Sequence, residues 1–339
     1  MSHIDASKIR LPGVRPAISL PTKYDLRDFG FVSSVKDQNP YGCCWAFGAF
    51  ASMESEFKVR TSTEYDFSEW HLAYFAYVDE SAAMPAFTQK AAPAGKDPVF
   101  DQGGNYLQAA AILSRSGAVL EADRPFQNVS PWPPASVPLK TDPVAKRLET
   151  LYLLGGAFDE GLLKNALMTY GAVAFRMIWS NDAYNNRTFA YYNNTRTGGP
   201  HGVALVGWDD DFPAGSFNSN PGTNGAWLVK NSWGNSFGDA GYFWISYADP
   251  TLEYPSVFIG ADTTGINRVY QYDPLGSVTN IGTGSDTAWF ANIFMAQPAD
   301  SVGVSAAGKE LVKAVSFYTG AIDSSYSIEV WIDSSTENP

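Results

Sequence analysis

The spacing of hydrophobic residues changes along the chain, from a helical repeat in the first half to alternation later. Between residues 44 and 60, apolar side chains recur every three or four positions, which is the repeat of one face of an α-helix. The residues that set this repeat are Ala46, Phe50, Met53 and Phe57. The polar residues Ser52, Glu54 and Ser55 fall off that face. The pattern predicts a helix over 44–60, buried along one face, that would hold its first residue rigidly.

Three further helices are expected in the first half of the chain, over residues 69–78, 105–117 and 160–170. Ser68 and Asp159 are placed as N-caps, because their side-chain oxygens can accept from the first free N–H groups of a helix. Gly117 and Gly171 are placed as C-terminal stops. Residues 128–142 are too rich in proline for regular structure and are expected to form a crossing loop.

After residue 171 the pattern becomes that of β-strands. The expected strands cover residues 172–179, 201–208, 226–233 and 241–248. Helices followed by strands predict an α+β fold.

A second change of pattern begins near residue 263. Four runs that alternate apolar and polar residues, over 269–273, 287–296, 311–319 and 326–332, predict a β-sandwich module. A full jelly-roll needs about eight strands, so whether this module is complete stays open. The expected organisation is an extended arm over 1–19, a main domain over 20–262 and the module over 263–339.

Composition narrows the class of protein. The chain has 339 residues, 45% of them hydrophobic, and a net charge of −12. Such a chain is globular and not intrinsically disordered, and its acidity argues against a nucleic-acid binder. No run of about 18 apolar residues is present to span a membrane, and the N-terminal residues lack an apolar stretch of signal-peptide length.

The two cysteines are adjacent, at positions 43 and 44. Adjacent cysteines cannot join distant parts of the chain, which excludes a scaffold held by disulfides, and a bond between the two would be strained. At least one of them is therefore expected to have a chemical role. A thiol at the start of the helix would ionise more easily, because unpaired N–H groups gather there.

The chain has three histidines that could act as a base for such a thiol. His3 lies in the expected arm, and His71 lies in an expected helix, where a core or surface histidine is the more typical interpretation. His201 opens an apolar strand after Gly198-Gly199-Pro200 and is the best candidate by elimination.

Three motifs together resemble the papain-like cysteine peptidases over residues 20–260. They are Cys44-Trp45-Ala46-Phe47 with Gln38 six residues upstream, the segment PHGVALVGW around His201, and Asn231-Ser232-Trp233-Gly234. The resemblance implies a helical lobe and a β-barrel-like lobe that meet at a cleft.

The resemblance also assigns roles. Cys44 would be the nucleophile, His201 its base, Asn231 the residue that orients the imidazole, and Gln38 a donor to the oxyanion. Trp233 would shield the bond between the histidine and the asparagine from water.

Substrate-binding positions follow from the same resemblance. The backbone of Gly103 and Gly104 would pair with an extended peptide. Tyr106 and Gly202 would flank the pocket for the second residue before the scissile bond, which implies an apolar or aromatic side chain there. No feature resembles the occluding loop of the exopeptidases, so an endopeptidase acting on peptides or proteins as a monomer is expected. Arg176 would favour an acidic side chain if the strand register brings it to the same pocket. No cofactor or metal is expected, and the acidic run 209–211 is interpreted as a solvated loop, not a calcium site.

One departure from the family pattern concerns disulfides. Tyr41 and Asp101 occupy positions where many members have a disulfide, which predicts a disulfide-free variant.

The C-terminal module resembles the lectin-like domain that follows some prokaryotic papain-like peptidases. This resemblance implies a carbohydrate partner and an extracellular or cell-surface location.

Two other functions remain open on the sequence. The chain could be a carbohydrate-binding surface protein with an inactive peptidase scaffold, or a cell-wall amidase with a similar Cys–His pair. The complete set of Gln38, Cys44, His201 and Asn231 favours the peptidase.

Overall fold

The computed structural model describes residues 19–78, 95–155 and 158–263, with separate positions beyond (269–270, 292, 294, 312, 315, 317 and 327–330). The expected arm over 1–19 and module over 263–339 lie almost wholly outside these residues. The boundaries given to them stay predictions.

The strands form one sheet in the order β2-β3-β10-β4-β7-β8-β9-β6-β5, with β1 paired to β7. Their bounds are β1 Lys23–Asp25, β2 Ala118–Val119, β3 Val144–Leu153, β4 Val173–Trp179, β5 Tyr184–Asn185, β6 Ala190–Tyr191, β7 Gly199–Asp209, β8 Ala226–Lys230, β9 Tyr242–Ser246 and β10 Glu253–Asp262. Neighbouring strands are antiparallel except for β6 and β9. The expected strands match β4, β7, β8 and β9, whereas β3 and β10 were not expected.

The helices are α1 Cys44–Thr61, α2 Glu69–Phe75, α3 Tyr106–Arg115 and α4 Glu160–Tyr170, with short 3-10 turns η2 Leu26–Phe29, η3 Pro134–Ser136, η4 Asn181–Ala183 and η5 Ala214–Ser216. All four predicted helices are present, and α2 ends three residues early. The caps are as expected: Ser68 Oγ accepts from His71 N at 3.0 Å and Asp159 Oδ1 accepts from Leu162 N at 2.7 Å. Gly171 has a φ of 92°, a left-handed backbone that favours glycine.

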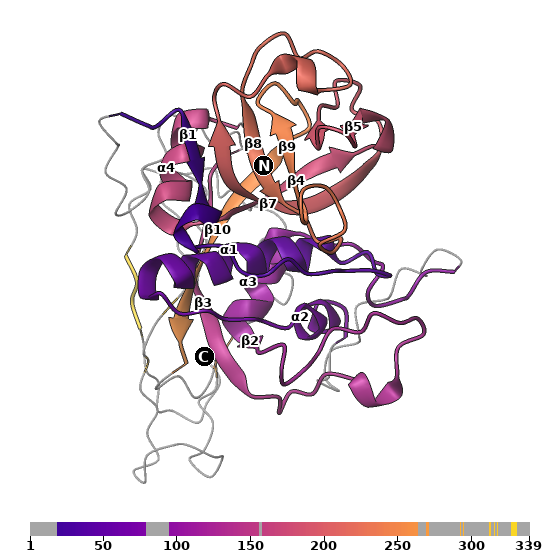
Figure 1. Ribbon diagram of the computed structural model, residues 1–339. Helices are drawn as coiled ribbons and strands as arrows, with labels where there is room; N and C mark the ends of the chain where they lie inside the picture. The colour runs from indigo at the N-terminus through magenta and orange to yellow at the C-terminus, as the bar shows by residue number, and fades with distance from the viewer. Residues whose placement is uncertain are drawn as a thin grey trace, which may run out of the picture.

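Helix α1 crosses the middle of the molecule, with β7, β8 and β9 on one side and α2 and β2 on the other (Figure 1). Two separate hydrophobic cores flank it, one around Trp208 in the β-rich lobe and one around Trp70 in the helical lobe. Phe50 of α1 belongs to the helical core and Ala51 to the β-rich core. The two-lobed α+β fold is therefore confirmed.

The expectation that α1 is buried along one face is wrong. Ser52, Glu54 and Ser55 are each at most 1% exposed, because the helix is packed between the two lobes. The two serines bond to backbone groups: Ser52 Oγ accepts from Phe258 N at 3.1 Å, and Ser55 Oγ donates to Phe31 O at 2.6 Å. A sequence pattern cannot distinguish such a polar face from a solvated one.

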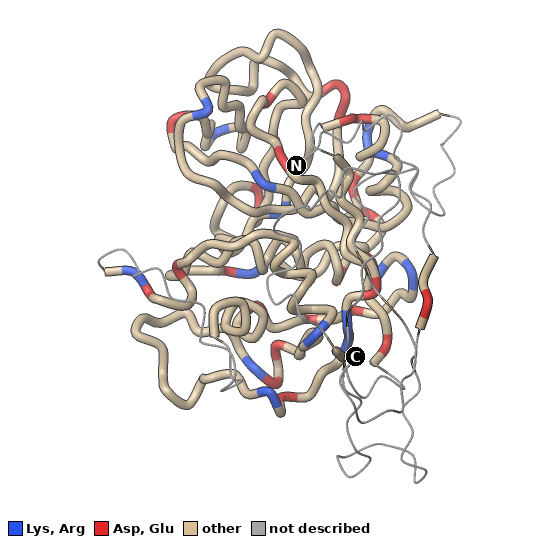
Figure 2. The backbone as a smooth tube through the Cα atoms, turned by 180° about the vertical axis from the view of Figure 1, so that it is seen from behind, with Lys and Arg blue, Asp and Glu red and all other residues tan. Residues whose placement is uncertain are grey.

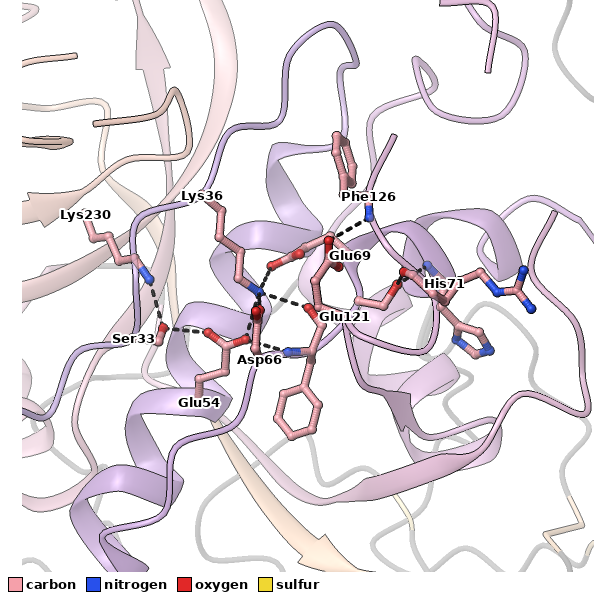
Figure 3. A network of polar contacts seen from close by, with 12 residues as sticks. Ser33, Lys36, Glu54, Asp66, Glu69, His71, Glu121, Phe126 and Lys230 are labelled. Carbon is pink, nitrogen blue, oxygen red and sulfur yellow. Dashed lines mark hydrogen bonds and ion pairs between the residues drawn. The ribbon is translucent and has the colours of Figure 1, made fainter. Parts of the chain in front are cut away.

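A buried network of charges surrounds Glu54 and joins the two lobes (Figure 3). Lys36 Nζ lies 2.9 Å from Glu54 Oε1, 2.9 Å from Glu69 Oε1 and 2.7 Å from Asp66 Oδ1. Burial opposes the charge on Lys36, but these carboxylates overcome it and raise its pKa well above the usual value. Elsewhere acidic and basic residues are interspersed over both lobes (Figure 2).

Replacing Lys36 by Met is predicted to destabilise the protein by roughly 3–5 kcal/mol, because the Glu54 carboxylate would stay buried without its cation. The control is Lys23→Met, which removes a surface ion pair to Asp209 whose lysine side chain is 63% exposed and should cost about 0–1 kcal/mol. Urea unfolding at pH 7 measures both. Equal losses for the two variants would contradict the prediction.

His71 is a core histidine, as the sequence suggested. It is 3% exposed in α2, its ring lies 4.7 Å from that of Phe75, and burial lowers its pKa from 6.5 to about 4. The folded state therefore binds this proton less readily than the unfolded state. The stabilisation from the neutral ring is complete above pH 6.5 and is lost as the pH falls towards 4.

Replacing His71 by Gln is predicted to remove part of the acid sensitivity. From pH 7.5 to pH 5, the wild-type protein should lose about 2 kcal/mol more unfolding free energy than the variant. Urea titrations of both proteins at the two pH values measure this difference. Parallel losses would show that His71 does not titrate on unfolding.

Candidate active site

Cys44 is the first residue of α1, and its thiol faces strand β7. Gly202 N donates to Cys44 Sγ at 3.2 Å. Burial raises the pKa of the thiol, while the backbone N–H groups of Gly202, Trp45 and Cys44 itself act in the opposite direction. The start of the helix thus supplies donors that stabilise a thiolate, but burial outweighs them and the pKa of Cys44 stays above its usual value, so the easier ionisation expected from the sequence is not seen in this state.

Gly202 allows the helix to approach this closely. A Cβ at this position would lie 3.1 Å from Trp45 N and 3.2 Å from Cys44 C. A larger residue would therefore push the start of α1 away from β7. The structure places Gly202 at the nucleophile, and its role in substrate binding stays a prediction.

His201 precedes Gly202 in β7, so it is the chain neighbour of the residue whose N–H contacts the thiol. His201 Nε2 lies 2.8 Å from Asn231 Oδ1, and Ser232 N donates to the same oxygen at 2.8 Å. The second donor identifies this atom as the amide oxygen, so Nε2 carries the proton and Nδ1 is left to act as the base.

Aromatic rings enclose the bond between His201 and Asn231. The Trp233 ring stacks on the imidazole, with centroids 4.6 Å apart, and Trp179 meets Trp233 edge-on at 4.8 Å. This burial lowers the pKa of His201 to about 4, opposed by the bond to Asn231. Trp233 covers the imidazole, which is the position that the shielding role requires.

Burial by itself favours the neutral forms of both Cys44 and His201. In this state Cys44 Sγ accepts a hydrogen bond from Gly202 N. Within the described residues, no hydrogen bond links Sγ to the imidazole. Moving the thiol proton to the ring leaves the net charge of the pair unchanged. The attraction between thiolate and imidazolium, strong where water is excluded, then offsets the loss of solvation.

Gln38 is fixed by bonds at both ends of its amide, to the segment before the nucleophile and to the segment after Asn231. Its Nε2 donates to Tyr41 O at 2.8 Å, and its Oε1 accepts from Ser232 Oγ at 2.7 Å. The second N–H of Nε2 remains for an oxyanion. Ser232 lies inside the Asn-Ser-Trp-Gly motif, but its role depends on the distant Gln38 and was not evident from the sequence.

The predicted substrate-binding residues of the helical lobe have different environments. Gly104 is exposed, and a Cβ there would lie 2.3 Å from the Trp45 indole, so the loop of Gly103 and Gly104 passes directly over the residue after the nucleophile. Tyr106 is buried, and its hydroxyl donates to Phe175 O at 2.7 Å. Tyr106 therefore ties α3 to β4 and presents little surface to a substrate.

The register of β4 settles the position of Arg176, which stands opposite Gly202. Its guanidinium lies 3.6 Å from Glu253 Oε2. The arginine thus reaches the strand position beside the nucleophile, but with a carboxylate partner that reduces any preference for an acidic substrate side chain.

Hydrogen bonds and aromatic packing hold together the segments at Tyr41 and Asp101, the two positions where many family members have a disulfide. Asp101 Oδ1 accepts from Gly42 N at 2.7 Å, and the Tyr41 ring packs 5.3 Å from Phe100.

Cys43 and Cys44 are both free. Cys43 lies in the helical core at 1% exposure, and burial raises its pKa well above the usual value, so its thiol is not suited to react.

The acidic run 209–211 is not simply a solvated loop, because two of its carboxylates form ion pairs with lysines. Asp209 lies 3.0 Å from Lys23 Nζ, and Asp210 lies 2.6 Å from Lys164 Nζ.

No group of three or more His, Cys, Asp or Glu side chains within the described ranges could hold a metal ion. In the same part of the chain, no helix combines the length and apolar character needed to cross a membrane.

Comparisons with known proteins agree with this geometry. The family model "Papain family cysteine protease" matches residues 20–254, and the model "Lectin like domain" matches residues 269–339. The oryzain gamma chain of Oryza sativa subsp. japonica is 30% identical over 238 residues, covering 68% of this chain and 56% of the relative. A viral cathepsin of Heliothis zea nuclear polyhedrosis virus is 28% identical over 246 residues, covering 71% and 56%. The chain spans about half the length of these curated relatives.

Two solved structures resemble this fold. One contains the cysteine protease and lectin-like domains of Cwp84, a surface layer associated protein of Clostridium difficile, with a TM-score of 0.60, 27% identity, and coverage of 72% of this chain and 53% of that one. The bromelain protease of Ananas comosus is similar in fold, with a TM-score of 0.50, 21% identity, and coverage of 71% and 99%. With the family model matching more than half of its residues, the chain belongs to the papain family of cysteine proteases.

Proposed function

We propose that this protein is a cysteine endopeptidase that hydrolyses peptide bonds through an acyl-enzyme. The observation that carries the proposal is the meeting of Cys44, at the start of α1, with His201–Gly202 of β7, while Asn231 holds the imidazole at 2.8 Å. Nucleophile, base and orienting group are thus present in one place. Its family membership supports the same chemistry and leaves the amidase alternative without support.

The first half of the reaction forms a thioester. The Cys44 proton passes to His201 Nδ1, and Sγ attacks the carbonyl carbon of the substrate. The negative oxygen of the tetrahedral intermediate accepts from the free N–H of Gln38 and from the Cys44 amide. The imidazolium then gives its proton to the departing amine as the C–N bond breaks.

The second half regenerates the enzyme. His201 takes a proton from a water molecule that attacks the thioester, and the same two donors hold the oxyanion. The C–S bond breaks, the carboxylic acid leaves, and the proton returns to the sulfur. Ser232 and Tyr41 keep Gln38 in place throughout, so the donor needs no reorganisation. A single donor of this kind contributes roughly 10²–10³-fold to the rate.

The loop of Gly103 and Gly104 and the strand at Gly202 flank the nucleophile on its two sides. Their bare backbones suit an extended peptide, whose main chain can pair with them without side chains in the way. A broad substrate class, peptides and exposed protein segments, follows from recognition through the main chain.

The two adjacent cysteines provide a matched test. Cys44→Ala is predicted to abolish hydrolysis of a fluorogenic peptide and covalent labelling by a peptidyl epoxide. Cys43→Ala should retain the labelling, because its side chain lies in the core, and should lose mainly stability. Mass spectrometry of the labelled protein locates the modified residue, and activity assays on both variants complete the comparison.

Labelling also decides between the peptidase and the inactive scaffold. A reduced wild-type protein that takes up no epoxide and cleaves no peptide, although folded, would favour the scaffold. Labelling at Cys43 would move the nucleophile and overturn the assignment.

A second function, carbohydrate binding at a cell surface, is supported by the match of residues 269–339 to the "Lectin like domain" model and by the likeness to the surface layer associated protein. The full chain is predicted to bind at least one member of a panel of cell-wall polysaccharides, in competition with the free sugar. The protein should also appear in the surface or culture-fluid fraction of the cells that make it. Absence of binding to every polysaccharide would reject the lectin function. The monomeric state stays a prediction.

A further inference from the structure

A polar hollow of about 520 Å³ lies on the β-rich lobe, and the mechanism above makes no use of it. Its lining residues are Asn181, Tyr184, Asn185, Asn186, Arg187 and Asn218. Amide groups and one cation therefore dominate its surface, which suits a polar ligand.

The hollow is joined to the active site by two tryptophans. Trp233 stacks on His201, and Trp179 meets Trp233 edge-on with its centroid 6.3 Å from that of His201. Trp179 Nε1 donates to Asn181 Oδ1 at 2.9 Å, and the Tyr184 ring lies 5.3 Å from Trp179. Asn181 and Tyr184, which line the hollow, thus contact Trp179, and Trp179 neighbours both His201 and Trp233.

The imidazole side of the site, where Trp179 and Trp233 lie, is the side of the departing half of the substrate. The acyl half stays on Cys44, whereas the amine receives its proton from His201 and so extends on the imidazole side. An extended peptide covers roughly 3.3–3.6 Å per residue. The Tyr184 ring, which lines the hollow, is 5.3 Å from Trp179, and Trp179 is 6.3 Å from the imidazole, so the hollow begins at most about four residues beyond His201.

Hydrogen bonds between loops fix the walls of the hollow. Asn185 Nδ2 and Thr188 Oγ1 both donate to Ser216 O, at 3.0 and 2.6 Å. Asn218 Nδ2 donates to Asp182 O at 3.1 Å and to Tyr184 O at 3.0 Å. The loop of residues 209–224, which lies between His201 and Asn231 in the chain, thus builds one wall.

Arg187 is the cation of this hollow. It is exposed, and its backbone N donates to Asn185 Oδ1 at 3.1 Å, but its guanidinium has no ion pair or hydrogen bond with the residues that the structure describes. By contrast, Arg27, Arg60 and Arg124 each contact a carboxylate. A guanidinium presents a planar set of donors that matches the two oxygens of a carboxylate.

We propose that this hollow binds a carboxylate on the departing side of the substrate, with Arg187 as its charged partner. The proposal rests on the proposed peptidase function. The carboxylate has two possible sources, an Asp or Glu side chain downstream of the scissile bond or the free C-terminus of a short substrate. The acyl half of the substrate plays no part in this recognition.

Three internally quenched peptides test the proposal. They are identical up to the scissile bond and differ at the third residue after it: Asn with an amidated extension, Asp with the same extension, or Asn as a free C-terminus. The second or third peptide is expected to show a kcat/KM about tenfold above the first, as a charge-assisted hydrogen bond would give. Which of the two gains distinguishes an acidic side chain from a chain end.

A charge-matched pair of variants shows whether the effect is local. In Arg187→Gln the ratio of acidic to neutral kcat/KM should fall towards one. In Lys140→Gln, which removes one charge from an exposed position of the helical lobe, the ratio should persist. Equal rates for all three peptides, or an unchanged ratio in Arg187→Gln, would overturn the proposal.

Binding to an inactive protein separates this proposal from the peptidase function. The peptides that correspond to the departing halves are titrated into the full chain with Cys44→Ala, and calorimetry measures their Kd. A carboxylate-bearing peptide should bind about tenfold more tightly than the neutral one. This result would support the hollow even if no peptide were cleaved, and equal Kd values would reject it even if cleavage were efficient.

Discussion

The contact between the start of α1 and strand β7 is the constraint on which the site depends. Gly202 lacks a side chain where one would collide with Trp45, and its amide reaches Cys44 Sγ at 3.2 Å. Because His201 precedes Gly202, the same contact brings the base to the nucleophile. The two lobes thus meet through backbone atoms, whose positions depend little on side-chain rotamers, and this gives the site a precision that loops alone would not provide.

This close approach carries an electrostatic cost, which the charge network offsets. A helix packed between two lobes has no solvated face, so Glu54 must be neutralised inside the protein. Lys36 provides the charge, Ser33 Oγ donates to Glu54 Oε2 at 2.6 Å, and Lys230 Nζ donates to that hydroxyl at 2.9 Å. Lys230 ends the strand that leads directly to Asn231. The groups that stabilise the lobe interface are therefore continuous along the chain with those that orient the histidine.

Much of this could be predicted from sequence because it is local. The cap at Ser68, the stop at Gly171 and the start of α1 at Cys44 depend on neighbouring residues alone. Strands β3 and β10 were missed because each is stabilised by a partner about a hundred residues away, and β3 carries charged residues at half-buried positions. The burial of Glu54 and the support of Gln38 by Ser232 also depend on distant segments, so no local pattern indicates them.

The adjacent cysteines show how the fold differentiates two identical side chains. Cys43 is the N-cap residue, with a non-helical φ of −109°, and Cys44 is the first helical residue, so the two side chains leave the backbone in different directions. Cys43 therefore turns into the helical core, where burial keeps its thiol protonated, while Cys44 turns to the N–H groups of the helix start and of Gly202. The N–H of Gly202 donates to Cys44 and not to Cys43. The identity of the nucleophile is thus fixed by the same backbone contact that assembles the rest of the site.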